Sequence, residues 1–148
     1  MYTFAVDATA DLAACRGCYC LAARRAARAL TRLYEDRLRP HGLRATQFSI
    51  LAALALKGPT PVGELADLLG LERTTLTRGA ALLRRNGWTT AGLSMDTREH
   101  RLQLTASGRG KLEAAFPAWR EAQELVKKLA DDGKLNLPRR IDISGAIA

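Results

Sequence analysis

The sequence predicts a mainly α-helical fold that carries one small β-hairpin. Apolar residues recur at helical spacing through most of the 148 residues, and alanine and leucine, both strong helix formers, supply most of them. The spacing changes only over residues 88–105, where two strand-like stretches flank a polar connection. A chain of this length is expected to form a single domain over residues 1–148 with its own hydrophobic core.

Two helical segments occupy the first part of the chain. Residues 11–40 carry an alanine-rich apolar stripe with arginines between its members, and the run ends at Pro40. Because small side chains let another helix approach closely, we expect this helix to pack on a partner. Residues 44–58 form a second helix, with Thr46 as the predicted N-cap and Gly58 as its stop.

Two shorter helices follow a proline-containing connection. The third covers residues 60–70, with Thr60 as its predicted cap and Pro61 at its first helical position. The fourth covers residues 71–87 and is closed by the Asn-Gly pair at its end.

The apolar spacing then changes from helical to alternating. Residues 88–95 and 101–105 are rich in strand-favouring residues and are joined by a charged connection, which predicts a β-hairpin. A last long helix over residues 105–133 begins at Thr105 or Ser107. The tail after it has no clear helical period, and we expect part of it to be mobile.

Positive charge is concentrated in one window of the chain. The net charge is +8, and residues 71–111 alone hold eight Lys/Arg against three Asp/Glu, whereas residues 112–148 are neutral. Such a concentration indicates a polyanionic partner, with an ordinary solvated cationic surface as the alternative.

No targeting or membrane segment is predicted. No apolar run reaches the roughly 18 residues that would span a bilayer, and the first residues carry aspartates where a secretory signal would carry lysines. We therefore expect a cytoplasmic protein with no membrane partner, in which cysteine thiols are kept reduced.

The spacing of three small or apolar residues predicts a helix-turn-helix. Ala66, Gly70 and Leu76 stand four and then six residues apart. The alanine lets two helices cross closely, the glycine permits a left-handed turn between them, and the leucine anchors the second helix in the core. An ordinary helical hairpin is the alternative.

The second helix of this motif carries side chains suited to reading DNA. Arginine can bind guanine edges with two hydrogen bonds, and threonine can contact phosphates or a thymine methyl group. The candidate contacts near its N-terminus are Arg73, Thr74, Thr75, Thr77 and Arg78. With the basic window and the hairpin that follows, these residues predict binding to double-stranded DNA.

The chain resembles the MarR family of transcriptional regulators over about residues 11–130. The resemblance is carried by RLYEDRLRPHGLRATQFSILAAL, PVGELADLLGLERTTLTRGAALLRRNGW and DTREHRLQLTASGR. It implies a winged helix-turn-helix homodimer, with residues 11–40 and 106–135 as dimerisation helices and residues 44–105 as the DNA-binding lobe. Such a dimer would bind a pseudo-palindromic operator with one recognition helix in each half-site.

The last of these stretches is similar to the wing signature of the family. The resemblance implies that Arg98 enters the minor groove, that Asp96 orients it and that Arg101 is the basic residue that follows. A narrow minor groove concentrates negative potential, which favours a guanidinium group there. The alternative is an ion pair between Asp96 and Arg98 that only holds the hairpin.

Other functional classes fit less well. An enzyme is not expected, because the only histidines, His41 and His100, have no obvious nucleophile beside them and no phosphate-binding glycine loop is found. A non-specific architectural DNA-binding protein is the main alternative, although a threonine-rich helix face favours base reading over it. The family resemblance favours repression over activation.

All three cysteines, Cys15, Cys18 and Cys20, lie within six residues. On one regular helix Cys18 and Cys20 would point about 160° apart, so a single-chain metal or metalloid site requires the helix to begin after Cys18. Three interpretations remain open: apolar packing in a dimer interface, sensing of an oxidant or electrophile, and binding of a metal or metalloid. No other cofactor is expected. In the sensing case, modification would rotate the two lobes away from the operator spacing.

The family resemblance also implies a small-molecule effector that binds between the dimerisation helices and the lobe. Tyr34 and Trp119 are candidate wall residues of such a pocket, and they are equally good core residues.

Overall fold

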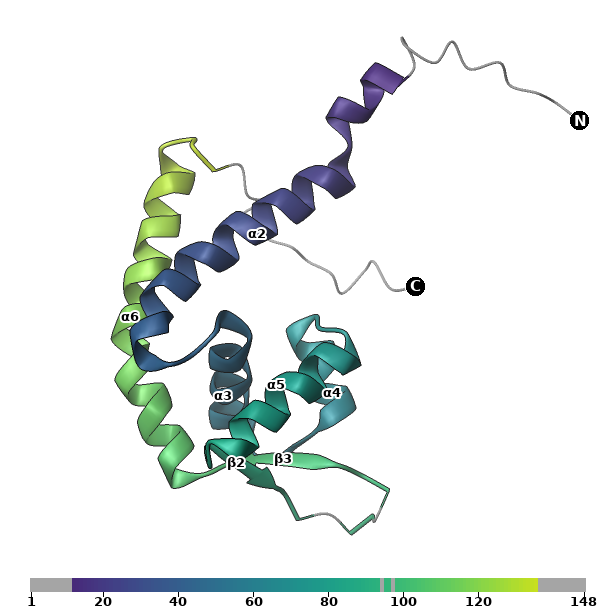
Figure 1. Ribbon diagram of the computed structural model, residues 1–148, viewed down its shortest axis with the longest axis vertical. Coiled ribbons are helices and arrows are strands. Elements are labelled where there is room, and N and C mark those ends of the chain that lie inside the picture. Colours follow the sequence, from purple (N-terminus) through teal and green to yellow (C-terminus); the bar gives the residue numbers. More distant parts are fainter. Residues whose placement is uncertain (1–11, 94, 97, 136–148) are drawn as a thin grey trace, which may run out of the picture.

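The computed structural model describes residues 12–93, 95–96 and 98–135, and it confirms a mainly helical fold with a small sheet (Figure 1). Within these residues the chain forms α-helices and antiparallel strands, with 3-10 turns at Ala13–Gly17 and Arg39–His41. The elements are α2 (Tyr19–Leu38), α3 (Ala45–Lys57), β1 (Thr60–Pro61), α4 (Val62–Leu69), α5 (Arg73–Arg85), β2 (Thr89–Ala91), β3 (Arg101–Leu104) and α6 (Ala106–Asp131).

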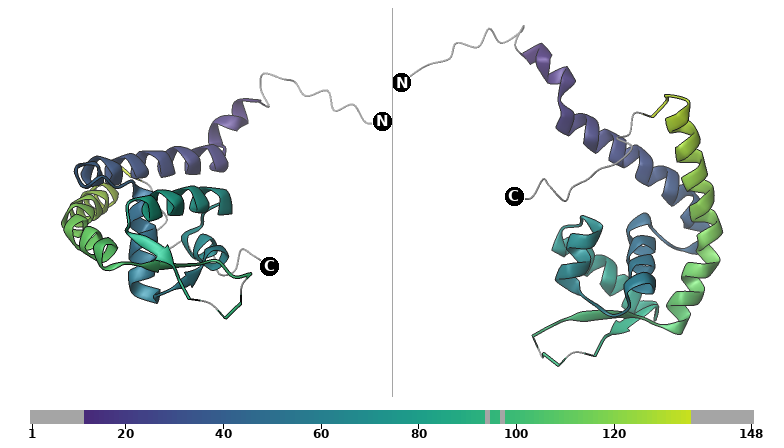
Figure 2. Two further views of the ribbon diagram at one scale, coloured as in Figure 1. Left: turned by 60° about the horizontal axis from the view of Figure 1, so that its bottom comes forward. Right: turned by 180° about the vertical axis from the view of Figure 1, so that it is seen from behind.

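The helices form two groups. α3, α4 and α5 pack together over the sheet as one lobe, while α2 and α6 lie against each other beside it (Figure 2). The core of the lobe consists of fully buried leucines, among them Leu51, Leu65, Leu76 and Leu83. α6 reaches this core with the small side chain of Ala115. Burial of these side chains fixes the positions of α4 and α5 relative to each other.

The sheet contains a strand that the sequence did not predict. β3 lies between β1 and β2 and pairs with both, with Thr60 opposite Leu102 and Thr89 opposite Leu104. The prediction that Thr60 caps the third helix is therefore wrong. Its hydroxyl donates to the Gly58 carbonyl at 2.9 Å instead, because its backbone is extended in β1. Pro61 occupies the N-cap position of α4, one residue before the helix begins.

The first predicted helix is interrupted near its start. Instead of one run over residues 11–40, a 3-10 turn ends at Gly17, Cys18 is extended with ψ 114°, and α2 begins at Tyr19. Cys18 acts as the N-cap, since its carbonyl accepts the Ala22 N–H at 3.0 Å. Glycine weakens a helix at this point because it has the largest backbone entropy to lose.

The start of α3 also differs from the prediction. Arg44, not Thr46, occupies its N-cap position. The Gln47 side-chain carbonyl reaches back and accepts the Arg44 N–H at 3.0 Å, so a residue one turn inside the helix does the capping. At the other end of the chain, α6 stops at Asp131, and all but the first two residues of the predicted mobile tail lie outside the described residues.

The start of α6 is fixed by Thr105, as predicted. The Thr105 hydroxyl accepts the Gly108 N–H at 3.0 Å and donates to the Gly87 carbonyl at 2.7 Å, and the Thr105 N–H bonds the Trp88 carbonyl at 3.1 Å. This junction requires the absence of a side chain at residue 108. A Cβ atom there would lie 2.0 Å from the Trp88 carbonyl oxygen.

In the part of the chain that the structure describes, no helix is long and apolar enough to cross a membrane.

We predict that Gly108→Ala destabilises the protein by at least about 3 kcal/mol. The added methyl group would collide with the Trp88 carbonyl, which is held in place by its hydrogen bond from the Thr105 N–H. Urea denaturation followed by circular dichroism measures this. Gly110→Ala is the matched control, since open space surrounds that glycine in the same helix. It should be neutral or stabilising by about 0.5–1 kcal/mol. Equal behaviour of the two variants would contradict the prediction.

Candidate nucleic-acid interface

The helix-turn-helix is built as its residue spacing predicts. Ala66 is buried at the crossing of α4 and α5, and Leu76 is fully buried on the inner face of α5. Gly70 adopts the left-handed conformation with φ 62°, which ends α4 and turns the chain. The Leu71 N–H then bonds the Ala66 carbonyl at 2.9 Å and closes the turn. α5 is thereby held against α4 with its N-terminus projecting from the lobe.

The five candidate side chains of α5 are all exposed: Arg73, Thr74, Thr75, Thr77 and Arg78. They surround Leu76, which faces the core, so the first two turns of α5 present their whole outer surface. The Thr77 hydroxyl donates to the Arg73 carbonyl at 2.8 Å, one turn earlier in the helix. Its methyl group and oxygen lone pairs stay available to a ligand.

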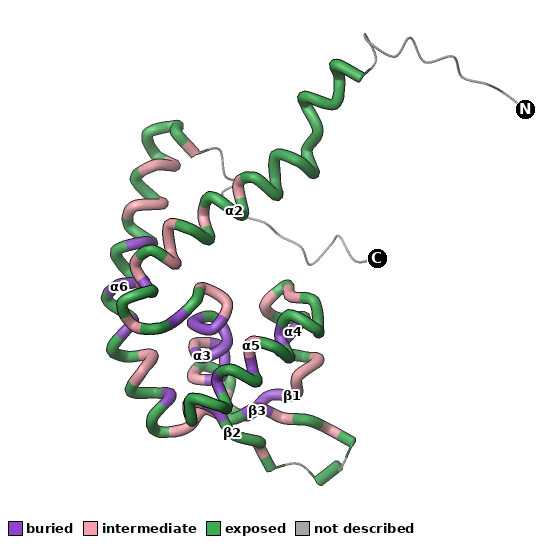
Figure 3. Tube along the Cα trace, viewed as in Figure 1, coloured by how far each residue is buried: buried purple, intermediate pink, exposed green. Residues whose placement is uncertain are grey.

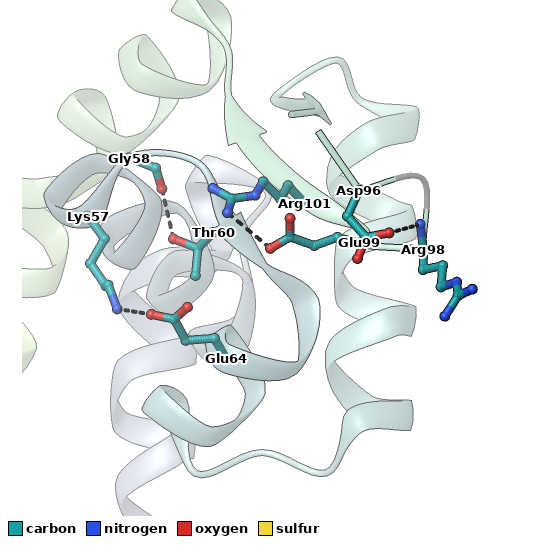
Figure 4. A network of polar contacts seen from close by, with 8 residues as sticks. All are labelled: Lys57, Gly58, Thr60, Glu64, Asp96, Arg98, Glu99 and Arg101. Atoms are coloured by element: carbon teal, nitrogen blue, oxygen red, sulfur yellow. Dashed lines mark hydrogen bonds and ion pairs between the residues drawn. The ribbon is translucent and has the colours of Figure 1, made fainter. Parts of the chain in front are cut away.

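The wing places Arg98 outward. Figure 4 shows its side chain directed away from the lobe, and it is exposed. Asp96 shapes the turn that carries it, because an Asp96 carboxylate oxygen accepts the Arg98 backbone N–H at 2.9 Å. The Asp96 carbonyl also accepts the Glu99 N–H at 3.1 Å. The aspartate thus orients Arg98 through its backbone.

Arg101 is placed differently from Arg98. Its guanidinium turns inward and pairs with the Glu99 carboxylate at 3.0 Å (Figure 4). The hydrogen bond that the Arg101 guanidinium donates to Glu99 raises the pKa of Arg101, with further support from the negative charges of Glu99 and Glu64. Its Nε–H is buried without a hydrogen-bond partner among the described residues. Arg101 therefore acts first on the shape of the wing, and a direct DNA contact by it stays a prediction.

A groove of about 330 Å³ separates α5 from the wing and is rich in basic side chains. Arg73 and Thr77 line it from α5, and Arg101 lines it from β3. Two further lining residues, Arg84 and His100, are absent from the predicted set. Arg84 could have been found, since it lies seven residues after Thr77 on the same helix face. His100 lies in the predicted wing directly before Arg101, but the sequence does not show that it lines this groove.

Comparisons with known proteins agree with this geometry. A B. subtilis protein described as an uncharacterized HTH-type transcriptional regulator, YwoH, is 33% identical over 109 residues, which cover 73% of this chain and 80% of that one. The crystal structure of the M. tuberculosis transcriptional regulator MosR in complex with DNA is 45% identical, with a TM-score of 0.69 over 75% of this chain and 81% of MosR. MarR from E. coli superposes with a TM-score of 0.65, with 25% identity over 78% of this chain and 89% of MarR.

The chain belongs to the MarR family of transcriptional regulators. No protein-family sequence profile matches it. The superposition on MosR and on MarR shows that the chain has the winged helix-turn-helix fold of these relatives.

The cysteines of this MarR-family chain all lie on its N-terminal arm. Cys15, Cys18 and Cys20 are free thiols, and all are exposed. The break before α2 places Cys18 outside the regular helix, so the angular argument against convergence no longer applies to it. Among the described residues, no three His, Cys, Asp or Glu side chains are grouped to hold a metal ion.

A pocket of about 340 Å³ lies between α2, α3 and α6 and includes both predicted wall residues. Trp119 stacks on Phe48 with ring centroids 5.8 Å apart. The Tyr34 hydroxyl donates to the side-chain carbonyl of Gln123, which ties α2 to α6. Both residues also pack against the core of the lobe, so they serve the fold whether or not a ligand binds.

Burial raises the pKa of Tyr34 above its usual value of about 10. As the pH rises, Tyr34 therefore ionises first in the unfolded chain, while the folded state still keeps its phenol neutral. We expect this contribution to stability to be complete below about pH 10 and to be lost as the pH rises through the higher folded-state pKa. Urea unfolding of the wild type and Tyr34→Phe at about pH 8 and pH 11 measures it. The wild type should lose more stability than Tyr34→Phe, and equal losses would contradict the prediction.

Proposed function

We propose that this protein is a transcriptional repressor that binds a pseudo-palindromic operator in double-stranded DNA as a homodimer. One observation carries the proposal: the exposed N-terminus of α5 and the outward Arg98 of the wing flank one basic groove. A helix of this exposure fits the major groove, and an arginine on a narrow hairpin fits the adjacent minor groove. The basic groove between them suits the sugar-phosphate backbone.

Similarity to a DNA complex supports this assignment. MosR, which is 45% identical, was solved in complex with DNA. The threonines of α5 favour reading of bases over coating of any duplex.

The exposed apolar surface of α2 supports the dimer. Tyr19 at the start of α2 is 92% exposed, Leu21 of the same helix is also exposed, and so is Leu12 just before the preceding 3-10 turn. Figure 3 shows the N-terminal half of α2 mostly exposed, beyond its contact with α6. An apolar arm of this kind is stabilised when a second copy covers it.

Release of the operator by thiol modification is the regulatory part of the proposal. The three thiols lie on the arm that we assign to the dimer, so a new bond there would change how the two lobes are spaced. A peroxide oxidises one thiolate to sulfenic acid, and a second thiol condenses with it to give a disulfide and water. A small aromatic ligand in the pocket of Tyr34 and Trp119 is the other candidate effector.

A DNA titration tests the proposed function. Fluorescence anisotropy compares the intergenic DNA beside the gene of this protein with a scrambled duplex of equal length, and footprinting locates the site. Two protected half-sites one helical turn apart are expected. Equal, strongly salt-dependent coating of both duplexes would favour an architectural protein instead.

We predict that Arg98→Ala weakens operator binding by about tenfold, because the variant brings one positive charge fewer to the DNA. The slope of the logarithm of the binding constant against log [salt] should become smaller in magnitude by about 1. Arg39→Ala is the matched control, since Arg39 is exposed near the end of α2 and pairs with Asp36 at 3.5 Å. The control should leave both quantities unchanged. An Arg98→Ala variant that binds as the wild type does would remove the wing contact from the proposal.

Mild peroxide should lower operator affinity of the wild type at least about tenfold, and reductant should restore it. The single variants Cys15→Ser, Cys18→Ser and Cys20→Ser identify the responsible thiols, since loss of a required thiol keeps DNA binding resistant to peroxide. Non-reducing electrophoresis distinguishes a disulfide within one chain from one between copies. Wild-type affinity that peroxide does not change would contradict the thiol switch while leaving the DNA-binding proposal intact.

A further inference from the structure

Two apolar side chains stand fully exposed on the wing. Leu93 is 94% exposed and Met95 is 105% exposed, which makes them the most exposed large apolar side chains among the described residues. Single exposed leucines are common on proteins, but two at the tip of one hairpin form a distinct surface feature. Neither side chain contributes to the core, so the fold gives no reason for an apolar residue at either position.

Leu93 and Met95 lie on the same wing connection as Arg98. Met95 directly precedes Asp96, whose carboxylate and carbonyl hold the turn that carries Arg98. The base of the wing is packed closely, since a Cβ atom on Gly92 would lie 3.0 Å from the Arg101 Cβ atom. The tip projects from this fixed base beyond the sheet and away from α2 and α6 (Figure 1).

We propose that Leu93 and Met95 make an apolar contact with the walls of the DNA minor groove beside Arg98. The inference rests on the proposed function, which places Arg98 in that groove. The groove walls are formed by deoxyribose rings, whose C–H surface is apolar. Minor-groove proteins also use leucine and methionine side chains in this groove, inserted between base steps. Continuity with the basic groove of α5 and the wing favours DNA as the occupant of this surface.

The salt dependence of DNA binding distinguishes this apolar contact from the contact made by Arg98. An arginine releases a condensed counterion from the DNA, so its loss changes the salt dependence of binding. An apolar side chain releases water and no ion, so its loss lowers affinity at every salt concentration by the same factor. The two contributions can therefore be separated on one chain.

The experiment compares three variants of the full chain by fluorescence anisotropy between about 50 and 200 mM salt. The double variant Leu93→Ser/Met95→Ser should bind about tenfold more weakly with an unchanged salt slope. The apolar exchange Leu93→Met/Met95→Leu should bind as the wild type does. Leu56→Ser is the matched control, because Leu56 is 88% exposed on α3, outside α5 and the wing. Thermal unfolding confirms that each variant is folded.

Each duplex answers a separate question. The comparison is made on the intergenic DNA and on the scrambled duplex, since a contact with deoxyribose does not require a particular base. A wild type that does not prefer the intergenic DNA would contradict the proposed function, whereas the wing contact is still measured on the scrambled duplex. Wild-type affinity of the double variant on both duplexes would overturn the inference. Unchanged affinity with impaired repression of a reporter gene would assign the tip to a protein partner and would also overturn it.

Discussion

The close approach of Gly108 to the Trp88 carbonyl is the constraint on which the rest of the structure depends. At this junction α5 has just ended, β2 begins, β3 ends and α6 starts. Thr105 joins these segments with three hydrogen bonds, to Gly87, Trp88 and Gly108. α6, which belongs to the proposed dimer interface, is therefore anchored directly to the strand that carries the wing and to the end of the proposed recognition helix.

The proposed recognition helix, α5, and the wing are joined into one rigid body. β3 is the central strand of the sheet, so it is paired with β1, which leads into α4, and with β2, which follows α5. The Val62 N–H bonds the His100 carbonyl at 2.8 Å and adds a further tie between α4 and the wing. Glu99 fixes Arg101 at the base of this unit, while Arg98 extends from it. Under the proposed function, a displacement of α2 or α6 would therefore move α5 and the wing together, because packed elements of this kind shift as rigid bodies.

The helix-turn-helix could be predicted because each residue of its pattern acts locally. The roles of Ala66, Gly70 and Leu76 follow from their size and backbone freedom. The structure confirms them, since Ala66 and Leu76 are buried and Gly70 is left-handed. β1 could not be predicted, since a two-residue strand has no periodicity and exists only through pairing with β3. The inward turn of Arg101 escaped prediction for a related reason, as the sequence shows Glu99 nearby without showing the direction of either side chain.

Two errors arose where a local signal was overridden by another. The alanine-rich pattern continues across Cys18, so periodicity alone extended the first helix beyond its observed start at Tyr19. Thr46 has a good capping side chain, but Gln47 reaches back to Arg44 and takes that role. In both cases the type of element was correct and its boundary was wrong, because boundaries depend on individual hydrogen bonds that composition does not encode.

The pocket of Tyr34 and Trp119 shares no lining residue with the groove of Arg73, Arg84 and Arg101. The thiols lie on a third segment, outside both. Mutation can thus alter the chemistry of one surface without touching the others. Under the proposed function, a gene duplicate of this protein would have a short evolutionary route to a new effector with its DNA target unchanged, and an equally short one to a new target under the old effector.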